Sequence, residues 1–586
     1  MASLYSLNSI CNASSRGLSA TPSSFQSHNK TQISVIRKIN YDYHPRIIQC
    51  RANKDQDIQD KDTGNFIDRR NMLIGLGSLY GATAAGLDAE HAAMAAPIGP
   101  PDLSECGPAH LPASAAPINC CPPPGTKIID FQLPCSSTPL RVRRAAHLVD
   151  DEYVAKYTKA YELMRALLDD DPRSFKQQAN IHCAYCDGAY DQSVTGFPKM
   201  DIYVHGSWLF LPFHRYYLYF HEKILGSLIG DPTFALPFWN WDTPAGMKLP
   251  SIFAKKGSSL YDEFRDAKHQ PPYLLDLNYH LNVDPNLPAQ QQYTNNLTTM
   301  YRQVVGAKTA TLFLGSPYRA GEAENPGAGT IEHVPHGPVH NWVGDRTQPN
   351  LEDMGDFYSA ARDPIFYAHH SNCDRMWTIW KGLGGKRKDF TDPDFLNAAF
   401  LFYDEHKQLV RVKIRNCLKQ ENLRYKYENV KIPWLHTKPV APTMRKAKRK
   451  ISWKKAATAT KFPILLDKAI QVLVKRPNTK SRSKTDKEDK EEILVISGIE
   501  LHRGDPIKFD VFINDEDEVS PESSAFASSF INVTQKHGRK DKKVIKTRLK
   551  LGITDILEYL DAEDDEDVLV TIVPRTSGKK KNGCFI

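Results

Sequence analysis

The sequence predicts a mainly α-helical domain followed by a small antiparallel β domain. Three stretches show apolar residues at helical spacing, and they are Asp150–Asp169, Trp208–Leu228 and Asp363–Trp380. After Trp380 the pattern changes to short β-rich runs separated by charged loops, which is typical of antiparallel sheets. No internal repeat is visible along the chain.

The bulk composition limits the classes of protein to be considered. At 586 residues the chain is too long for one typical domain, so we expect two or three folded units plus processed segments. Its 41% hydrophobic and 25% charged residues are usual for a soluble globular protein. The formal charge of +8 reflects lysines and arginines crowded into an N-terminal leader and Met444–Lys490, which we interpret as a removed peptide and a solvated linker. We therefore expect no nucleic-acid partner.

The N-terminal region has the features of a two-part targeting signal. Residues 1–50 are rich in Ser, Asn and Thr and contain one acid, Asp42, as chloroplast transit peptides do. Arg69-Arg70 then precede an apolar run that ends in Ala93–Ala95, which is typical of a twin-arginine translocation signal and its cleavage site. This run falls short of the ~20 apolar residues needed to span a membrane. We predict a mature chain in the thylakoid lumen of the chloroplast, without a membrane span but with thylakoid association left open.

The predicted mature chain begins with an extended segment. Cys106–Pro139 is rich in Pro, Cys and Ser, a composition typical of loops. Disulfide bonds in this region would pin the segment to a core, and they require an oxidising compartment. Ser251–Thr330 is mixed and polar, whereas Phe395–Phe402 and Leu409–Ile414 are predicted strands. The cysteines near the start are Cys106, Cys120, Cys121 and Cys183.

The C-terminal part is expected to form a separate β domain. Arg445–Lys455 is strongly basic and is predicted to be a linker. Lys475–Glu492 is almost wholly polar and is predicted to be a mobile loop. The β-rich runs are Ile470–Val474, Ile493–Ile496, Ile507–Ile513 and Val568–Val573.

Histidine spacing indicates a metal site. His336 and His340 lie four residues apart, and Pro335 suits the start of a helix, so both imidazoles face the same side. A second predicted helix carries His205 and His214.

A third predicted helix carries His369 and His370, followed one turn later by Asp374. Adjacent helical residues point ~100° apart, so only one of the two histidines meets a shared metal. Asp374 favours His370, because a carboxylate near a ligating ring fixes its orientation and raises its basicity.

The residue types narrow the choice of metal. A site made of imidazoles suits copper or zinc, whereas magnesium and calcium prefer oxygen ligands. A hydrolytic zinc site would normally add a carboxylate, as in H-E-x-x-H, and the sequence has no such motif. The pattern therefore favours redox copper, with a zinc hydrolase as the alternative.

Longer motifs around these histidines resemble those of plant polyphenol oxidases, a family of type-3 copper proteins. These motifs are HCAYC (His182–Cys186), VHGSWLFLPFHRYYLYF (Val204–Phe220), HVPHGPVHNWVG (His333–Gly344) and DPIFYAHHSNCDRMW (Asp363–Trp377). The resemblance extends to ALPFWNWD (Ala235–Asp242), DPDFLNAAFLFYDE (Asp392–Glu405), YKY (Tyr425–Tyr427) and PIKFDVFIN (Pro506–Asn514). Together they cover most of the chain from Cys106 to Pro574.

The resemblance implies a mainly α catalytic domain whose four-helix-bundle core holds two copper ions, with dioxygen as co-substrate. It also implies a C-terminal antiparallel β-sandwich-like domain. The implied ligands are His182, His205 and His214 for one ion and His336, His340 and His370 for the other. The implied covalent links are a thioether between Cys186 and His205 and disulfides Cys106–Cys121 and Cys120–Cys183.

Four further residues are assigned by the same resemblance. Phe357 matches an aromatic gate over the first copper, and Glu332 matches an acid that holds a water near the second. Gly337 occupies a position where relatives with strong phenol hydroxylation often carry Asn. Gly337 has no side chain to orient that water, and Asn341 compensates at most in part. We therefore expect catechol oxidation with weak or no monophenol hydroxylation.

The composition, the signal motifs and the resemblance together predict the domain organisation. Residues 1–95 are the cleaved signal, 96–435 the catalytic domain, 436–460 the basic linker and 461–586 a β domain that plugs the cleft until a protease cuts the linker. We expect a latent proenzyme that oxidises o-diphenols to o-quinones and reduces dioxygen to water. The alternatives are an oxidase or hydroxylase specialised for one plant phenolic, such as a chalcone or lignan, and an oxygen carrier of the hemocyanin kind.

Overall fold

The computed structural model describes most of the chain from residue 96 onward. The described residues are 96–112, 114–125, 127–280, 284, 286–439, 462–477, 482–515, 523–534, 544–575 and 583–586, together with strand β1 (Ile48–Gln49). Apart from β1, the predicted targeting signal lies outside the described residues, as does most of the predicted linker. The chain divides into two units, Met1–Asp42 and Tyr43–Ile586, and only the second contains described residues. Within the described residues, no helix has the length and apolar character to cross a membrane.

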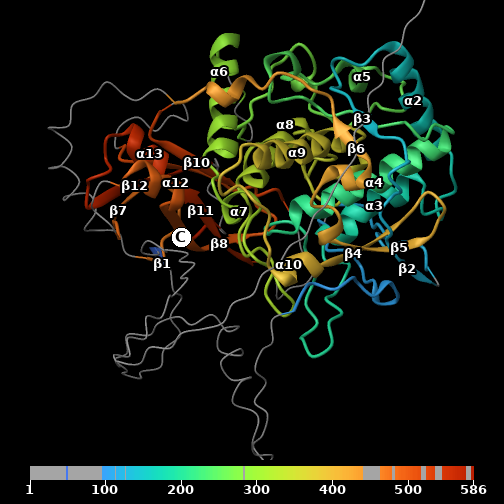
Figure 1. Ribbon diagram of the computed structural model, residues 1–586, viewed down its shortest axis with the longest axis horizontal. Coiled ribbons are helices and arrows are strands. Elements are labelled where there is room, and N and C mark those ends of the chain that lie inside the picture. The colour runs from blue at the N-terminus through green and yellow to red at the C-terminus, as the bar shows by residue number, and fades with distance from the viewer. Residues whose placement is uncertain are drawn as a thin grey trace, which may run out of the picture. The chain divides into compact units, whose positions relative to one another are not determined.

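The region between residues 96 and 439 is mainly helical (Figure 1). Its α-helices are α2 (Asp151–Arg165), α3 (Phe175–Cys186), α4 (Phe210–Leu228), α5 (Ser251–Ala254), α6 (Ala289–Met300), α7 (Ala310–Phe313), α8 (Gly337–Val343), α9 (Ile365–Gly382) and α10 (Pro393–Asn397). Two short segments with π-type turns are η4 (Tyr301–Val305) and η5 (Glu332–His336), and the second is kinked at Val334, whose backbone is extended. Short 3-10 turns are Leu103–Glu105, Pro244–Gly246, Ala267–His269, Ala360–Arg362, Ile414–Asn416, Gln420–Leu423 and Pro433–His436.

Local sequence accounts for where these helices begin and what they bury. The Asp150 carboxylate accepts the N–H of Tyr153 at the start of α2, and the Ser174 hydroxyl accepts the N–H of Gln177 at the start of α3. Helices α4 and α9, which the apolar pattern predicted, pack against each other. Both are buried almost all round, as helices in the centre of a core must be.

The helical region also contains two small sheets. Strands β2 (Ile128–Asp130), β5 (Leu409–Lys413) and β4 (Ala399–Tyr403) form one, in the order β2-β5-β4, and β3 (Arg141–Arg143) pairs in parallel with β6 (Tyr425–Tyr427) in the other. The predicted strand Phe395–Phe402 is wrong in its first part. Asp392 caps α10 by accepting the N–H of Asp394, and Phe395 therefore lies in that helix.

The C-terminal region forms an antiparallel β domain, drawn in orange and red in Figure 1. One sheet has the order β10-β9-β12-β7, and β8 pairs with β11 in a second sheet, where β1 lies parallel to β8. The strands are β7 (Ile470–Lys475), β8 (Ile493–His502), β9 (Lys508–Ile513), β10 (Phe526–Ile531), β11 (Val544–Gly552) and β12 (Asp567–Pro574), with helices α12 (Lys484–Asp489) and α13 (Thr554–Tyr559).

The β domain has an apolar core of its own, separate from the core of the helical region. Val533 is an exception, because it follows β10 yet packs with the core of the helical region.

The predicted mobile loop Lys475–Glu492 is wrong for its described part. It contains α12, and Arg476 forms a buried ion pair with Glu492. The arrangement confirms the predicted fold class, a mainly α domain followed by an antiparallel β domain.

Candidate active site

The six histidines expected to bind metal come together in the centre of the helical region. His182 lies on α3, His214 on α4, His336 and His340 at the start of and within α8, and His370 on α9. All six side chains are buried. Four helices thus carry five of the six rings, as a four-helix-bundle core requires.

His205 is the exception, because it precedes α4 instead of lying on it as predicted. Gly206 adopts a φ of +68°, a left-handed conformation that interrupts any helix at this point. A Cβ atom on Gly206 would lie only 2.1 Å from Oδ1 of Asn325. The turn at Gly206 therefore separates His205 from α4 and brings it beside the other rings.

Backbone carbonyls fix the tautomer of four of the rings. Nδ1 of His182 donates to the carbonyl of Phe357 (2.8 Å), and Nδ1 of His214 donates to that of Phe210 (2.8 Å). Nδ1 of His340 donates to the carbonyl of Met354 (2.7 Å). Nδ1 of His336 donates to the backbone carbonyl of Glu332 (3.1 Å). A ring whose Nδ1 carries the proton keeps its lone pair on Nε2, the form that binds a metal.

The Nε2 atoms of these rings fit metal ligation. In the described part of the chain, Nε2 of His182, His205, His214 and His336 is buried without a hydrogen-bond partner. The Nε2 atoms of His340 and His370 lie 3.2 Å apart. Two ligands of one tetrahedral ion, each bound at about 2.0–2.1 Å, would lie about 3.3 Å apart.

Burial keeps the imidazoles in the neutral form that coordinates. It lowers the pKa of His182 to about 3 and that of His340 to about 4. The pKa values of the other four rings lie well below the usual value for the same reason. These residues therefore suit copper or zinc.

The rings form two adjoining groups. The centroids of His336, His340 and His370 lie 4.6–5.3 Å from one another, and those of His182, His205 and His214 lie 5.2–5.7 Å apart. His214 stacks on His370 at 4.1 Å and joins the groups.

His369 also lies beside the second group, with its ring 5.0 Å from that of His340. Its Nδ1 accepts a hydrogen bond from the indole N–H of Trp241 (3.2 Å).

Cys186 lies beside His205 in the first group. One ligand atom each of His182, Cys186 and His205 lies within 4.8 Å of the others. Neither nitrogen of His205 has a hydrogen-bond partner among the described residues. Stacking on Phe357 restrains the ring instead, with centroids 4.1 Å apart and planes 15° from parallel.

Asp374 does not have the predicted role of orienting His370. Its carboxylate accepts hydrogen bonds from Arg215 (2.5 Å) and from the hydroxyls of Tyr425 and Tyr427 (both 2.6 Å). Nδ1 of His370 has no partner in the described chain. Two nearby arginines attract the carboxylate away from the ring and lower the pKa of Asp374 against its burial.

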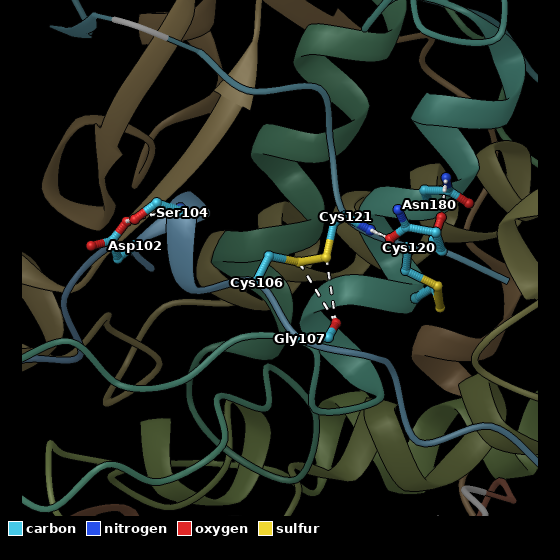
Figure 2. Close-up of a disulfide and its surroundings, with 9 residues drawn as sticks. Asp102, Ser104, Cys106, Gly107, Cys120, Cys121 and Asn180 are labelled. Atoms are coloured by element: carbon cyan, nitrogen blue, oxygen red, sulfur yellow. Dashed lines mark hydrogen bonds between the residues drawn. A yellow bond between two sulfur atoms is a disulfide. The ribbon is translucent and has the colours of Figure 1, made fainter.

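The two disulfides are the pairs implied by the resemblance, Cys106–Cys121 and Cys120–Cys183. The first closes a loop within the extended N-terminal segment, and the second ties that segment to α3. Figure 2 shows the region, in which the side-chain amide of Asn180 on α3 donates to the carbonyl of Asn119. Cys183 directly follows His182, so the Cys120–Cys183 disulfide connects the N-terminal segment to the first group of rings.

A cavity of about 50 Å³ lies over the histidines and is lined by both domains. Glu332, Gly337 and Phe357 line it on the catalytic side. The N–H of Gly206 donates to Glu332 (2.6 Å), and burial raises the pKa of this acid to about 8. Asn341 is buried on α8 but is not among the residues that line the cavity.

The β domain closes this cavity with the end of β10. Ile531 and Val533 line it, and Cγ2 of Ile531 would lie 2.8 Å from a Cβ atom on Gly337. The hydroxyl of Thr534, the residue after Val533, donates to the carboxylate of Asp356 (3.0 Å). A cavity that holds benzene measures about 150 Å³, so this one is too small for a catechol ring.

Sequence reasoning missed two cavity residues, Asn325 and His333. Asn325 lies in a polar loop without a motif. His333 directly follows Glu332, and this position was a signal that it borders the cavity.

Three family models match the chain. The common central domain of tyrosinase matches residues 172–383, the polyphenol oxidase middle domain matches 389–440, and the chloroplastic polyphenol oxidase C-terminal domain matches 462–583.

Individual relatives match along most of the chain. A chloroplastic polyphenol oxidase of Malus domestica is 54% identical over 576 residues, which cover 96% of this chain and 95% of that protein. Aureusidin synthase of Antirrhinum majus is 56% identical over 493 residues, or 82% of this chain and 87% of that protein. The solved structure of latent apple tyrosinase is 56% identical, has a TM-score of 0.73 and covers 78% of this chain and 98% of that one. The chain therefore belongs to the plant polyphenol oxidase family, whose members are type-3 copper oxidoreductases.

Proposed function

We propose that this chain is a copper-dependent oxidase that converts o-diphenols to o-quinones and reduces dioxygen to water. Two catechols give up four electrons and four protons in all, which reduce one dioxygen to two waters. The observation that carries the proposal is the set of six buried neutral imidazoles with converging Nε2 atoms. His182, His205 and His214 would hold one copper, and His336, His340 and His370 the other. The copper pair supplies the exchange of electrons between catechol and dioxygen.

The residues around this centre would bind and orient the phenol. Phe357 stacks on His205 and offers an aromatic face beside the first copper position. One oxygen of Glu332 is held by Gly206, and the other is buried without a partner among the described residues, where it would hold a water. Gly337 offers no side chain to that water. We therefore propose weak or no monophenol hydroxylation, with Asn341 compensating at most in part.

We also propose that the chain is made as a latent proenzyme. The end of β10 leaves too little space for a catechol over the histidines. A protease that cuts residues 436–460 would free residues 461–586 from the catalytic domain and so open the cavity. Relatives are named chloroplastic, and the twin-arginine motif supports delivery to the thylakoid lumen.

The experiment measures oxygen uptake by the copper-loaded full chain with 4-methylcatechol and with tyramine. We expect little uptake before limited proteolysis, a large increase with the catechol afterwards, and little uptake with tyramine. Equal turnover of both phenols would contradict the activity proposal. Full activity of the uncut chain, unchanged by cleavage, would contradict latency.

A second candidate is an oxidase specialised for one plant phenolic, such as a chalcone or lignan. The 56% identity to aureusidin synthase favours it, since this value is as high as the identity to relatives named polyphenol oxidase. A panel of simple catechols, chalcones and lignans assayed side by side separates the two. Preference for one complex phenol by kcat/KM would support the specialised enzyme.

A further inference from the structure

Two polar side chains in the cavity have no place in the proposed copper chemistry. Asn325 and His333 both line the cavity, and the His333 side chain is only 6% exposed. In the part of the chain that the structure describes, Nδ2 of Asn325 and Nε2 of His333 are buried without hydrogen-bond partners. Buried polar atoms nearly always find a partner, which can be a water, so these two atoms offer hydrogen-bonding positions to a molecule that enters the cavity.

The β domain fixes the protonation of His333. The imidazole forms a hydrogen bond with the backbone of Ile531 and packs against the ring of Phe530, with centroids 5.1 Å apart. Burial lowers the pKa of His333 to about 4, so the ring is neutral. Because Nε2 has no partner, the bond to Ile531 uses Nδ1, and Nε2 keeps the lone pair that accepts a hydrogen bond.

The backbone fixes the position of Asn325. Its φ of +59° is left-handed, a conformation that Asn tolerates better than most residues. Its Oδ1 lies against Gly206, where a Cβ atom would come within 2.1 Å. The amide oxygen is thereby directed to Gly206, and Nδ2 remains as a donor.

We propose that Asn325 and His333 form a binding subsite for a neutral hydroxyl group on the side chain of a catechol substrate. This inference rests on the proposed function. A hydroxyl accepts a hydrogen bond from Nδ2 of Asn325 and donates one to Nε2 of His333, so it satisfies both atoms. A carboxylate only accepts and would face the lone pair of His333. An ethyl group satisfies neither atom. Phe530 and Ile531 cover His333 in the uncut chain, so the subsite opens when the β domain leaves. The bond to Ile531 is then lost, but a solvent-exposed imidazole has a pKa of about 6.5 and is mostly neutral above pH 7, so it still offers one lone pair to a hydroxyl donor.

The test uses the copper-loaded full chain after its linker has been cut, with two catechols of equal length. One carries a 2-hydroxyethyl group at ring position 4 and the other an ethyl group. We expect the ratio of their kcat/KM values to favour the hydroxyl compound. Asn325→Gly, which tolerates the left-handed backbone, and His333→Phe should each lower this ratio about tenfold, mainly through KM, since each removes one hydrogen bond. His333→Gln retains an acceptor and should keep most of the preference.

Thr547 lines the same cavity from the β domain and provides the matched control. Thr547→Val should leave the ratio unchanged in the cut enzyme. An unchanged ratio in both Asn325→Gly and His333→Phe overturns the subsite. The subsite is also overturned if His333→Phe changes only the increase in activity on cleavage and leaves the kcat/KM ratio of the two catechols unchanged. His333 would then serve only as a contact for the β domain.

Binding without turnover separates this inference from the proposed function. Tryptophan fluorescence under anaerobic conditions gives the Kd of each catechol whether or not the enzyme oxidises it. Tighter binding of the hydroxyl compound, lost in His333→Phe, supports the subsite even where no oxygen is consumed. Absence of oxygen uptake with every catechol contradicts the proposed function and leaves the binding result standing.

Discussion

The two groups of histidines are built in different ways. His336 and His340 lie one turn apart at the start of one helix, and Nε2 of His340 already lies 3.2 Å from that of His370. The first group joins α3, a turn and α4, and its central ring, His205, has no hydrogen bond in the described chain. Local helical geometry thus assembles most of the second group, whereas distant contacts assemble the first. The first group should therefore be the more sensitive to changes far from the metal.

Removing a ligand from the second group gives the largest expected effect. We expect His370→Ala to abolish catechol oxidation and to lower the copper content from two ions to about one per chain, because a binuclear site needs both ions. His369→Ala is the matched control and should retain both ions, because the Nδ1 lone pair of His369 accepts from Trp241 and its neutral ring therefore carries the proton on Nε2. Metal analysis and oxygen uptake check both variants. Loss of copper in His369→Ala with retention in His370→Ala would reverse the assignment.

The next effect concerns Cys186 in the first group. A thioether to His205 would replace the hydrogen bond that this ring lacks, and its loss should weaken the first copper about 10- to 100-fold, as loss of a supporting contact does at other metal sites. Cys186→Ser should leave the second copper in place. Chelator titration of the two ions measures the difference.

Intact mass provides the control for the thioether. The wild-type chain should weigh less than the sum of its residues by two hydrogen atoms beyond those lost in its disulfides. A full mass, together with unchanged copper affinity in Cys186→Ser, would contradict the link.

The same contrast explains what could be predicted from the sequence. The i, i+4 pair His336 and His340 and the apolar pattern of α9 are local features, and the structure agrees with them. Helix α3 was missed because polar residues such as Gln178 and Asn180 hide its helical pattern, although both are buried. Local patterns also gave no sign of the left-handed turn at Gly206 that excludes His205 from α4.

Errors at longer range have a different cause. Asp374 was assigned to His370 because the two lie one turn apart, but Tyr425 and Tyr427 come from a strand about fifty residues later and occupy its carboxylate. Likewise, no local pattern shows that Ile531 will meet Gly337, because their contact depends on how two domains pack.

The disulfides test the dependence of the first group on distant contacts. Chain-entropy estimates give about 4 kcal/mol for Cys120–Cys183, which joins residues 63 apart, and about 3 kcal/mol for Cys106–Cys121, which are 15 apart. Cys120→Ser should therefore lower the free energy of unfolding more than Cys106→Ser. It should also weaken the first copper, since Cys183 follows His182. Urea unfolding and copper titration measure both quantities, and equal effects of the two variants on copper would contradict the proposed coupling.

The smallest expected effect concerns Gly337, the point at which the second group meets the β domain. A Cβ atom here would lie 2.8 Å from Cγ2 of Ile531, and overpacking of this kind costs about 1–2 kcal/mol. Gly337→Ala should loosen the β domain and raise the activity of the uncut chain about 5- to 30-fold. Oxygen uptake with 4-methylcatechol before and after cleavage measures this activation.

The sign of the effect distinguishes a clash with the β domain from a general disturbance of α8. Gly337 has helical backbone angles, φ −59° and ψ −48°, in which Ala is usually more favourable than Gly, but Pro338 follows it, and a Cβ atom before proline is disfavoured in this conformation. These two effects oppose each other, so Gly337→Ala should change the stability of the cut enzyme little while it activates the uncut one. Ile531→Ala relieves the clash between Ile531 and a Cβ atom at position 337. The activity of the uncut double variant Gly337→Ala/Ile531→Ala should therefore be lower than the activity expected if the effects of the two single variants were additive. Additive effects, or a loss of stability after cleavage, would place the disturbance within α8 and not at its contact with Ile531.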